Sequence, residues 1–279
     1  MKMVRELFLS LAILFSLGTV KAQQVEDMPD SVVYKNTPTG PLNMYVLYPH
    51  NITEVKKYPC IVFFFGGGWI KGNTTQFEYQ ANYFCKRGMV CFLVDYRVKS
   101  RQGTTPFESL EDAKSAIRFI RKKSGVFHIY PDSLIASGGS AGGQLAAAAA
   151  VIDKYNDLSD DTTINAKPDA LVLFNPVIDN GPGGYGYDRI GEAYKNFSPL
   201  HNIKKGAPPT IIFLGTKDHL IPVPTMQYYK TEMEKVGSRC DLILYNDVGH
   251  GFFNKEGFRE ATLFQADQFL VSLGYLEDR

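Results

Sequence analysis

Short apolar runs, rich in β-branched and aromatic residues, alternate with longer helix-length segments along most of this 279-residue chain. Such alternation is typical of an α/β fold, in which helices cover both faces of a mostly parallel sheet. We expect eight strands, at Ser31–Tyr34, Leu42–Leu47, Cys60–Phe65, Val90–Tyr96, Leu134–Ser137, Ala170–Asn175, Thr210–Gly215 and Asp241–Asn246. Helical or mixed segments are expected at Thr75–Arg87, Phe107–Lys123, Ala141–Tyr155, Pro224–Val236 and Arg259–Leu273.

The first two expected strands are joined by a short turn at Asn36–Pro41, which predicts an antiparallel hairpin at one edge of the sheet. No linker-like composition divides the rest of the chain, so we expect a single domain from residue 23 to residue 279. The stretch between Asn175 and Thr210 has room for only a short excursion. We therefore expect little or no cap domain.

The N-terminus has the pattern of a secretory signal peptide. Lys2 and Arg5 precede an apolar run, Leu7–Leu17, and small residues at Val20 and Ala22 suit a signal peptidase. As a helix this run would rise only about 16 Å, roughly half the hydrocarbon core of a bilayer, which argues against a membrane anchor. We expect residues 1–22 to be removed near Ala22 and the mature protein to be exported to the periplasm or the extracellular space.

Charge is nearly balanced, with 30 Lys and Arg against 29 Asp and Glu and a formal net charge of +1. No long basic or acidic run is present. The chain thus lacks the electrostatic footprint of nucleic-acid binding or of polybasic membrane attachment. We expect neither kind of partner.

The cysteines show no C-x-x-C spacing of the kind found in zinc or redox sites. Two of them fall within apolar runs that read as buried strands, where a free thiol behaves as a small apolar side chain. We favour four buried thiols, although an exported chain could form a bridge such as one from Cys85 to Cys91. The four are Cys60, Cys85, Cys91 and Cys240.

The pattern G-x-S-x-G occurs at Gly138–Gly142, between an expected strand and an expected helix. In this setting it predicts a sharp turn that exposes the hydroxyl of Ser140 as a nucleophile at the N-terminus of a helix. Glycines are needed because side chains two residues on either side would collide where strand meets helix. A phosphate-binding loop is the alternative, but the chain lacks G-x-x-x-x-G-K-[ST].

A nucleophilic serine needs a base and an acid that orients the base. His250 follows the last expected strand in a glycine-flanked loop, and Asp218 follows the strand before it. The carboxyl ends of parallel strands gather catalytic groups, so we predict His250 as base and Asp218 as acid. Asp247 is the rival acid. The remaining histidines, His50, His128, His201 and His219, are poorer candidates for the base.

Three glycines, Gly66–Gly68, end another expected strand. Their backbone N–H groups can point at a ligand without obstruction, as an oxyanion hole requires. We predict that the N–H groups of Gly67, Gly68 and Ala141 form this hole.

These segments together resemble the α/β-hydrolase superfamily, and within it the esterases that carry H-G-G-G, D-Y-R and G-x-S-A-G-G. Here the three motifs lie at Phe65–Trp69, Asp95–Arg97 and Gly138–Gly143. Phe65 stands where that family usually has His. The resemblance covers nearly the whole mature chain and implies hydrolysis of a carboxylic ester through an acyl-enzyme, with no metal or organic cofactor.

The substrate is less constrained. Export, an uncapped site and a resemblance to secreted acetylxylan and feruloyl esterase-like proteins favour an acylated plant polysaccharide or its oligosaccharides. Trp69, Tyr185 and Tyr187 are candidate contacts for sugar rings. A serine exopeptidase on the same fold and a ligand-binding pseudoenzyme are the competing functions.

Overall fold

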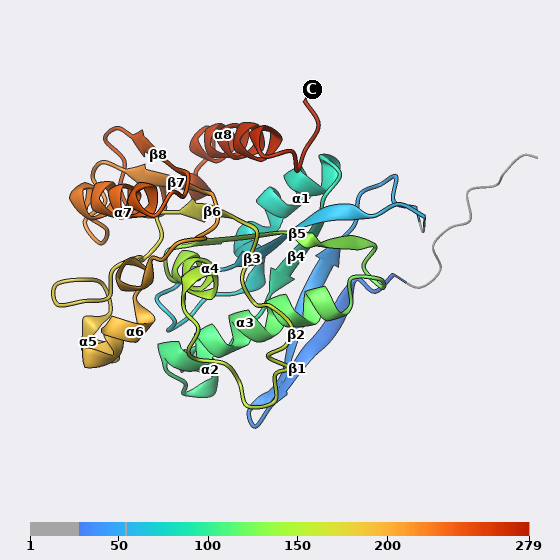
Figure 1. The fold of residues 1–279 in the computed structure, drawn as a ribbon, viewed down its shortest axis with the longest axis horizontal. Helices are drawn as coiled ribbons and strands as arrows, with labels where there is room; N and C mark the ends of the chain where they lie inside the picture. The colour runs from blue at the N-terminus through green and yellow to red at the C-terminus, as the bar shows by residue number, and fades with distance from the viewer. Residues whose placement is uncertain (1–27, 54, 279) are drawn as a thin grey trace, which may run out of the picture.

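The computed structural model describes residues 28–53 and 55–278, so the expected signal peptide lies outside the described residues. In the described part, one eight-stranded sheet has the order β1-β2-β4-β3-β5-β6-β7-β8 (Figure 1). Its strands are β1 (Ser31–Thr37), β2 (Gly40–Leu47), β3 (Tyr58–Phe64), β4 (Val90–Val94), β5 (Ile129–Gly139), β6 (Ala170–Phe174), β7 (Thr210–Gly215) and β8 (Cys240–Tyr245). The prediction of eight strands in a mostly parallel sheet is confirmed.

The edge hairpin is also as predicted, because β1 and β2 pair antiparallel across a turn of two residues, Pro38 and Thr39. β2 pairs antiparallel with β4, and the five pairings from β4 to β8 are parallel. Parallel pairing places the carboxyl ends of β3 to β8 at one edge of the sheet.

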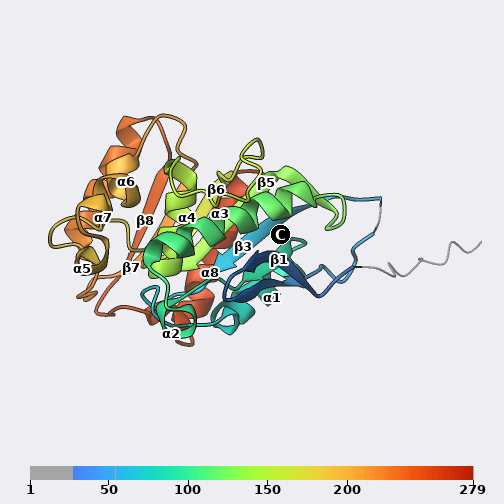
Figure 2. The same ribbon diagram turned by 90° about the horizontal axis from the view of Figure 1, so that it is seen from below.

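Helices cover both faces of the sheet, as Figure 2 shows for α3 and α4 on one side and α1 on the other. The side chains of β3 alternate between the two cores: Val62 and Phe64 pack in the first core, and Ile61 and Phe63 in the second. The first core lies under α3 (Pro106–Lys122), α4 (Ala141–Val151) and α7 (Val223–Lys235), and the second under α1 (Glu78–Lys86) and α8 (Phe258–Ser272).

Several predicted boundaries were wrong by a few residues. β5 begins at Ile129 instead of Leu134, and the expected helical or mixed segment Thr75–Arg87 consists of a 3₁₀ turn, η1 (Thr74–Phe77), followed by α1. α4 ends at Val151 instead of Tyr155, because Ile152 adopts an extended backbone. There the Lys114 ammonium donates to the carbonyls of residues 152, 153 and 154 at 2.9, 3.3 and 2.6 Å, and so satisfies oxygens just beyond the helix end.

The segment between β6 and β7 contains only one-turn elements: α5 (Tyr187–Ile190), η2 (Gly191–Ala193), α6 (Tyr194–Phe197) and η3 (Pro199–Asn202). It forms no separate cap domain, as expected. The remaining short elements are α2 (Lys99–Gln102) and η4 (Phe252–Asn254). None of the described helices is both long and apolar enough to cross a membrane.

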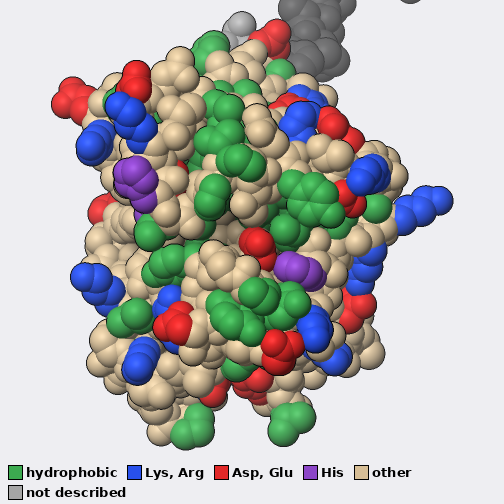
Figure 3. Space-filling model, turned by 90° about the vertical axis from the view of Figure 1, so that its left-hand side faces the viewer, with side chains coloured by type: hydrophobic (Ala, Val, Ile, Leu, Met, Phe, Trp, Pro, Cys, Tyr) green, Lys and Arg blue, Asp and Glu red, His purple; other side chains and the backbone are tan. Residues whose placement is uncertain are grey.

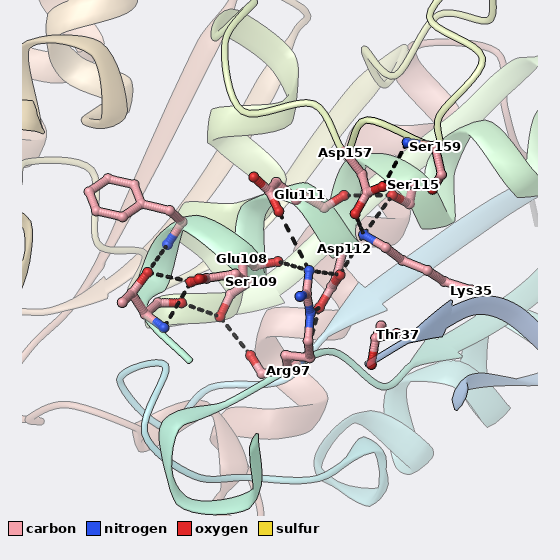
Figure 4. A network of polar contacts seen from close by, with 12 residues as sticks. Lys35, Thr37, Arg97, Glu108, Ser109, Glu111, Asp112, Ser115, Asp157 and Ser159 are labelled. Atoms are coloured by element: carbon pink, nitrogen blue, oxygen red, sulfur yellow. Dashed lines mark hydrogen bonds and ion pairs between the residues drawn. The ribbon is translucent and has the colours of Figure 1, made fainter. Parts of the chain in front are cut away.

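A buried ion network ties the edge hairpin and the end of β4 to α3 (Figure 4). Asp112, whose side chain is fully buried, accepts from Lys35 Nζ at 2.7 Å and from Arg97 Nε and Nη2 at 2.8 and 2.7 Å. Lys35 also pairs with Asp157 at 2.7 Å. Asp112 is therefore the anion shared by two cations whose side chains are largely shielded from water.

Replacing Asp112 with Ala leaves these buried cations without their common partner, so we expect the free energy of unfolding to fall by about 3 kcal/mol. Urea denaturation measures this. The matched control is Lys204→Ala, which breaks an exposed pair with Asp153 and should change stability by less than about 1 kcal/mol. Equal effects of the two variants would contradict a structural role for the network.

All four cysteines are free and buried, as favoured from the sequence. Burial raises the pKa of Cys240 to about 12 and also raises the pKa of Cys60, Cys85 and Cys91. A raised pKa lowers the thiolate fraction at neutral pH and hence the reactivity of the thiol.

We therefore expect the native protein to react slowly with Ellman's reagent at pH 8, and the protein unfolded in guanidinium to show four free thiols. Fewer than four thiols after unfolding without reductant would indicate a disulfide and contradict this assignment.

Candidate active site

Ser140 lies at the junction between β5 and α4 with a backbone that L-residues rarely adopt, φ 53° and ψ −117°. The neighbouring glycines allow this geometry. A Cβ on Gly142 would lie 2.0 Å from the carbonyl oxygen of Phe64, and one on Gly138 would lie 2.4 Å from the backbone of Gly142. The turn that the sequence predicts at Gly138–Gly142 is therefore present, and only glycine fits at these two positions.

A hydrogen-bonded chain links Ser140 to a histidine and a carboxylate. His250 Nε2 lies 2.9 Å from Ser140 Oγ, and His250 Nδ1 lies 2.8 Å from Asp218 Oδ2. Ser140 follows β5, Asp218 follows β7 and His250 follows β8, so the parallel sheet brings together three residues that are up to 110 positions apart. The structure thus unites all three residues predicted as nucleophile, acid and base.

Asp218 is held rigidly in place. Its side chain is fully buried, and Oδ1 accepts from the N–H groups of Leu220 and Ile221 at 2.9 and 3.0 Å, leaving Oδ2 for His250. The rival acid, Asp247, is largely exposed and pairs with Lys217 at 3.0 Å. Asp218 is therefore the carboxylate that orients the imidazole.

The other histidines lie away from Ser140. His50 and His219 are exposed, and His128 lies in the turn before β5. His201 is on η3, where its Nδ1 lies 3.8 Å from Asp179. None of the four lines the pocket at Ser140.

The glycine loop after β3 faces Ser140. The N–H of Gly66 donates to Gln76 Oε1 at 2.5 Å, whereas those of Gly67 and Gly68 have no acceptor within the described residues. Both glycines have positive φ, 130° and 65°. Together with the N–H of Ala141, the first residue of α4, they can donate to an anion that forms beside Ser140.

Phe65, at the position where the resembled esterases usually have His, supports this loop by stacking. Its ring lies 4.0 Å from that of Tyr96 at 13° between the ring planes, and the Tyr96 hydroxyl donates to the Phe65 carbonyl at 2.6 Å. The guanidinium of Arg101 lies 5.9 Å from the Phe65 ring centre. Packing thus replaces whatever polar contacts a histidine would make there.

The pocket at Ser140 has a volume of about 350 Å³ and mixed walls. Its apolar side chains are Ile70, Leu220 and Phe253, and its polar ones include Gln76, Asn175, Tyr185 and Asn254.

Figure 3 views the side of the molecule that carries α5, α6 and α7. Hydrophobic side chains gather along the middle of this face, and charges of both signs are interspersed without a large patch of one sign.

Of the three aromatic residues predicted to contact substrate, only Tyr185 lines the pocket. The prediction for Trp69 was wrong, because this side chain is 1% exposed and packs against Phe197 and beneath Arg189. Tyr187 lies on α5 and bonds Glu192 at 2.9 Å, outside the pocket. These aromatic residues lie in glycine-rich loops, and the sequence alone did not indicate which of their rings would be buried.

Asn175 is a site residue that the sequence analysis missed. It directly follows β6, is fully buried, and has a left-handed φ of 35°, which Asn tolerates better than most residues. Its Oδ1 accepts from Gly251 N–H at 2.9 Å, and its Nδ2 lies 3.4 Å from His250 Nε2. A polar residue at the carboxyl end of a buried strand was the available signal.

No group of three or more His, Cys, Asp or Glu residues that could hold a metal ion occurs in the part of the chain that the structure describes.

Two family models match the chain. The BD-FAE model matches residues 44–182, and the model of the dienelactone hydrolase family matches residues 170–268. Together the two matched regions include Ser140, Asp218 and His250.

Among curated proteins, an acetylxylan esterase from Xylanibacter ruminicola is 29% identical over 75% of this chain and 43% of its own length. An isoprenylcysteine alpha-carbonyl methylesterase from Arabidopsis thaliana is 25% identical over 79% of this chain and 56% of its own length. The chain thus spans about half the length of these curated relatives.

Among solved structures, esterase 2 from Thermogutta terrifontis, phosphoramylated by tabun, is 38% identical with a TM-score of 0.86. The match covers 92% of this chain and all of that one. The same esterase has also been solved with propionate bound, again at 38% identity.

Replacing Asn175 with Ala removes the bond that holds the backbone next to His250. We expect kcat for p-nitrophenyl acetate to fall about 10- to 100-fold with KM nearly unchanged, because a small displacement of a reacting group lowers the reaction rate strongly. Asn202→Ala is the control, since Asn202 also bonds the backbone, by donating to the carbonyls of Lys195 and Ser198, but lies on η3. Full activity of the Asn175 variant would show that Asn175 does not position His250.

Proposed function

This chain belongs to the esterases of the α/β-hydrolase superfamily, and from that membership we propose that it is a serine esterase with Ser140 as its nucleophile. We further propose that its natural substrates are acetylated, or feruloylated, plant polysaccharides and their oligosaccharides.

The observation that carries the proposal is the hydrogen-bonded chain from Asp218 through His250 to Ser140, beside N–H groups of Gly67 and Gly68 that have no acceptor among the described residues. Nucleophile, base, orienting acid and oxyanion donors are the four parts that acyl transfer through an acyl-enzyme requires. Each comes from a different part of the sequence, and each lies at the same edge of the sheet.

In the proposed reaction, Ser140 Oγ attacks the ester carbonyl carbon while His250 Nε2 accepts the hydroxyl proton. The carbonyl oxygen becomes an oxyanion, which accepts hydrogen bonds from the N–H groups of Gly67, Gly68 and Ala141. When this tetrahedral intermediate collapses, the bond between the carbonyl carbon and the alcohol oxygen breaks, and the alcohol leaves with the proton from His250. Water then attacks the acyl-enzyme by the same route, and the carboxylic acid and free Ser140 are the products.

Asp218 acts on this cycle without exchanging a proton. Its Oδ2 accepts from His250 Nδ1–H, which fixes the tautomer that leaves Nε2 free to accept the proton of Ser140. It also stabilises the imidazolium that forms when Nε2 is protonated. Since Leu220 and Ile221 occupy Oδ1, the carboxylate cannot rotate away without losing both bonds.

Two observations support a carbohydrate ester as substrate. The similar protein from Xylanibacter ruminicola is an acetylxylan esterase. The pocket at Ser140 carries several amide and hydroxyl side chains and is not covered by a cap domain, so a chain of sugars could approach it. The similar plant methylesterase and the propionate-bound bacterial esterase favour small acyl or alkyl esters as the second candidate.

The exopeptidase and pseudoenzyme alternatives have less support. The relatives named above are esterases, and no member of the Ser–His–Asp set is missing or displaced. We also propose that the protein is exported after cleavage near Ala22, on the strength of the N-terminal sequence pattern alone.

The proposal predicts that residues 23–279 release acetate from acetylated xylan and hydrolyse p-nitrophenyl acetate, and that Ser140→Ala lowers both rates at least about 10³-fold. Methyl ferulate tests the feruloyl alternative in parallel. A Ser140→Ala protein that keeps most of its activity would refute the nucleophile. Equal or better turnover of long-chain acyl esters than of acetylated sugars would refute the carbohydrate substrate.

Two further controls separate the competing functions. A fluorophosphonate probe should label the wild type and leave Ser140→Ala unlabelled, whereas a pseudoenzyme would resist labelling. Peptide p-nitroanilides should not be cleaved, whereas an exopeptidase would cleave them.

A further inference from the structure

A second recess, of about 390 Å³, adjoins the pocket at Ser140. It lies between the start of α1 and the junction of η4 with α8. Gln76 and Asn254 line both hollows, so the recess begins where the pocket ends. A ligand that extends out of the pocket on this side would enter it.

Gln76 lies at the boundary between the recess and the pocket at Ser140 and lines both. Its Oε1 accepts from the N–H of Gly66 in the glycine loop, while its Nε2 has no acceptor within the described residues. The side-chain amide is therefore oriented by the loop, and its two N–H donors remain available to a ligand.

The recess is lined by polar side chains throughout. Four of them are amides, from Gln76, Gln80, Asn82 and Asn254, and no aliphatic side chain is among its walls. Amides both donate and accept hydrogen bonds, which suits a ligand whose own groups do both. An alkyl or acyl chain would find no aliphatic side chain to pack against among these residues.

Tyr79 supplies an aromatic wall that is held in place. The guanidinium of Arg259 lies 3.6 Å from the centre of its ring, and Arg259 is paired with Glu260 at 2.9 Å. Tyr79 is nevertheless 44% exposed. A fixed, accessible ring with an apolar body and a polar edge is suited to contact with the face or edge of a sugar.

Gln80 is the strongest sign that the recess receives a ligand. Its side chain is 1% exposed, it lines the recess, and its Oε1 has no hydrogen-bond partner in the described part of the chain. Buried acceptors without a donor weaken a fold and are uncommon. This oxygen is itself covered, so a ligand hydroxyl that reached it after a small shift of the side chain would satisfy it.

The charge in the recess argues for a neutral ligand. Arg259 is its only cation among the described lining residues, and that guanidinium is already paired with Glu260. Glu78 contributes a negative charge to the lining of the recess. A phosphate or a polyanion would meet no free positive group.

We propose that this recess binds sugar residues on the alcohol side of the scissile ester, so that the acyl group lies at Ser140 and the glycan chain runs over α1 toward α8. The inference rests on the proposed function and adds to it a second binding site, with Tyr79 and Gln80 as its specificity-determining residues. The acyl-transfer chemistry itself does not involve them.

The first test compares two substrates. Tyr79→Ala should lower kcat/KM for acetylated xylo-oligosaccharides about tenfold and leave that for p-nitrophenyl acetate unchanged, since the small ester does not reach the recess. Tyr130→Ala is the matched control, because Tyr130 is also exposed, at 48%, but lies near the amino end of β5. Equal loss on both substrates, or no loss on either, would overturn the proposal.

The second test does not depend on turnover. In the Ser140→Ala background, unesterified xylohexaose should bind measurably by calorimetry, and Gln80→Met should weaken that binding about tenfold. Met keeps the shape of the side chain and removes the unpartnered oxygen, so the fold should be as stable or more stable. Unchanged affinity in Gln80→Met, or no binding of the oligosaccharide, would overturn the recess as a sugar site.

The two tests keep failures apart. If the serine esterase hypothesis is wrong, Ser140→Ala will keep its activity toward p-nitrophenyl acetate. Loss of the sugar site alone would leave that result intact and show only in the oligosaccharide measurements.

Discussion

The backbone of Ser140 is the constraint on which the rest of the site depends. Its conformation, φ 53° and ψ −117°, costs on the order of 1–3 kcal/mol and persists only when its surroundings enforce it. Ser140 N–H donates to Phe174 at the end of β6, and Ser140 C=O accepts from Val177 just beyond, at 3.0 and 3.1 Å. The central strands therefore hold the strained residue, and α4 can begin directly after it only because Gly142 passes against the carbonyl of Phe64.

The glycine loop opposite Ser140 is stabilised by aromatic and cationic packing from two separate segments. Tyr96 stacks on Phe65 from the end of β4, and Arg189 on α5 donates to the carbonyl of Gly68. The same guanidinium lies 5.3 Å from the ring centre of Trp69 and 5.1 Å from that of Tyr185. Trp69 thus has a structural part in the site: it helps to anchor the short insert between β6 and β7 against the loop that carries the predicted oxyanion donors.

Much of the fold and of the proposed machinery could be predicted because it rests on local patterns. The eight apolar runs, the glycines around Ser140 and the positions of Asp218 and His250 after successive strands are properties of short segments combined with the geometry of parallel sheets. Boundaries were harder where a long-range contact decides them. α4 stops at Val151, where Lys114, on a different helix, bonds the carbonyls that follow. Asn175 was missed because its bond to Gly251 joins residues 76 positions apart.

The sequence by itself determined the class of fold, the turn that strains a serine and the chain order of the residues proposed as nucleophile, acid and base, because hydrophobic periodicity and glycine requirements are local. Only the tertiary structure decided which aromatic rings are buried and which line a pocket, since the sequence shows Trp69 and Tyr185 as equal candidates. It alone brought α1 and α8 together beside the pocket at Ser140 and left Gln80 with an unpartnered oxygen between them. The physical reason is that hydrogen-bond satisfaction and burial depend on which distant segments pack together, and a local pattern carries no record of that packing.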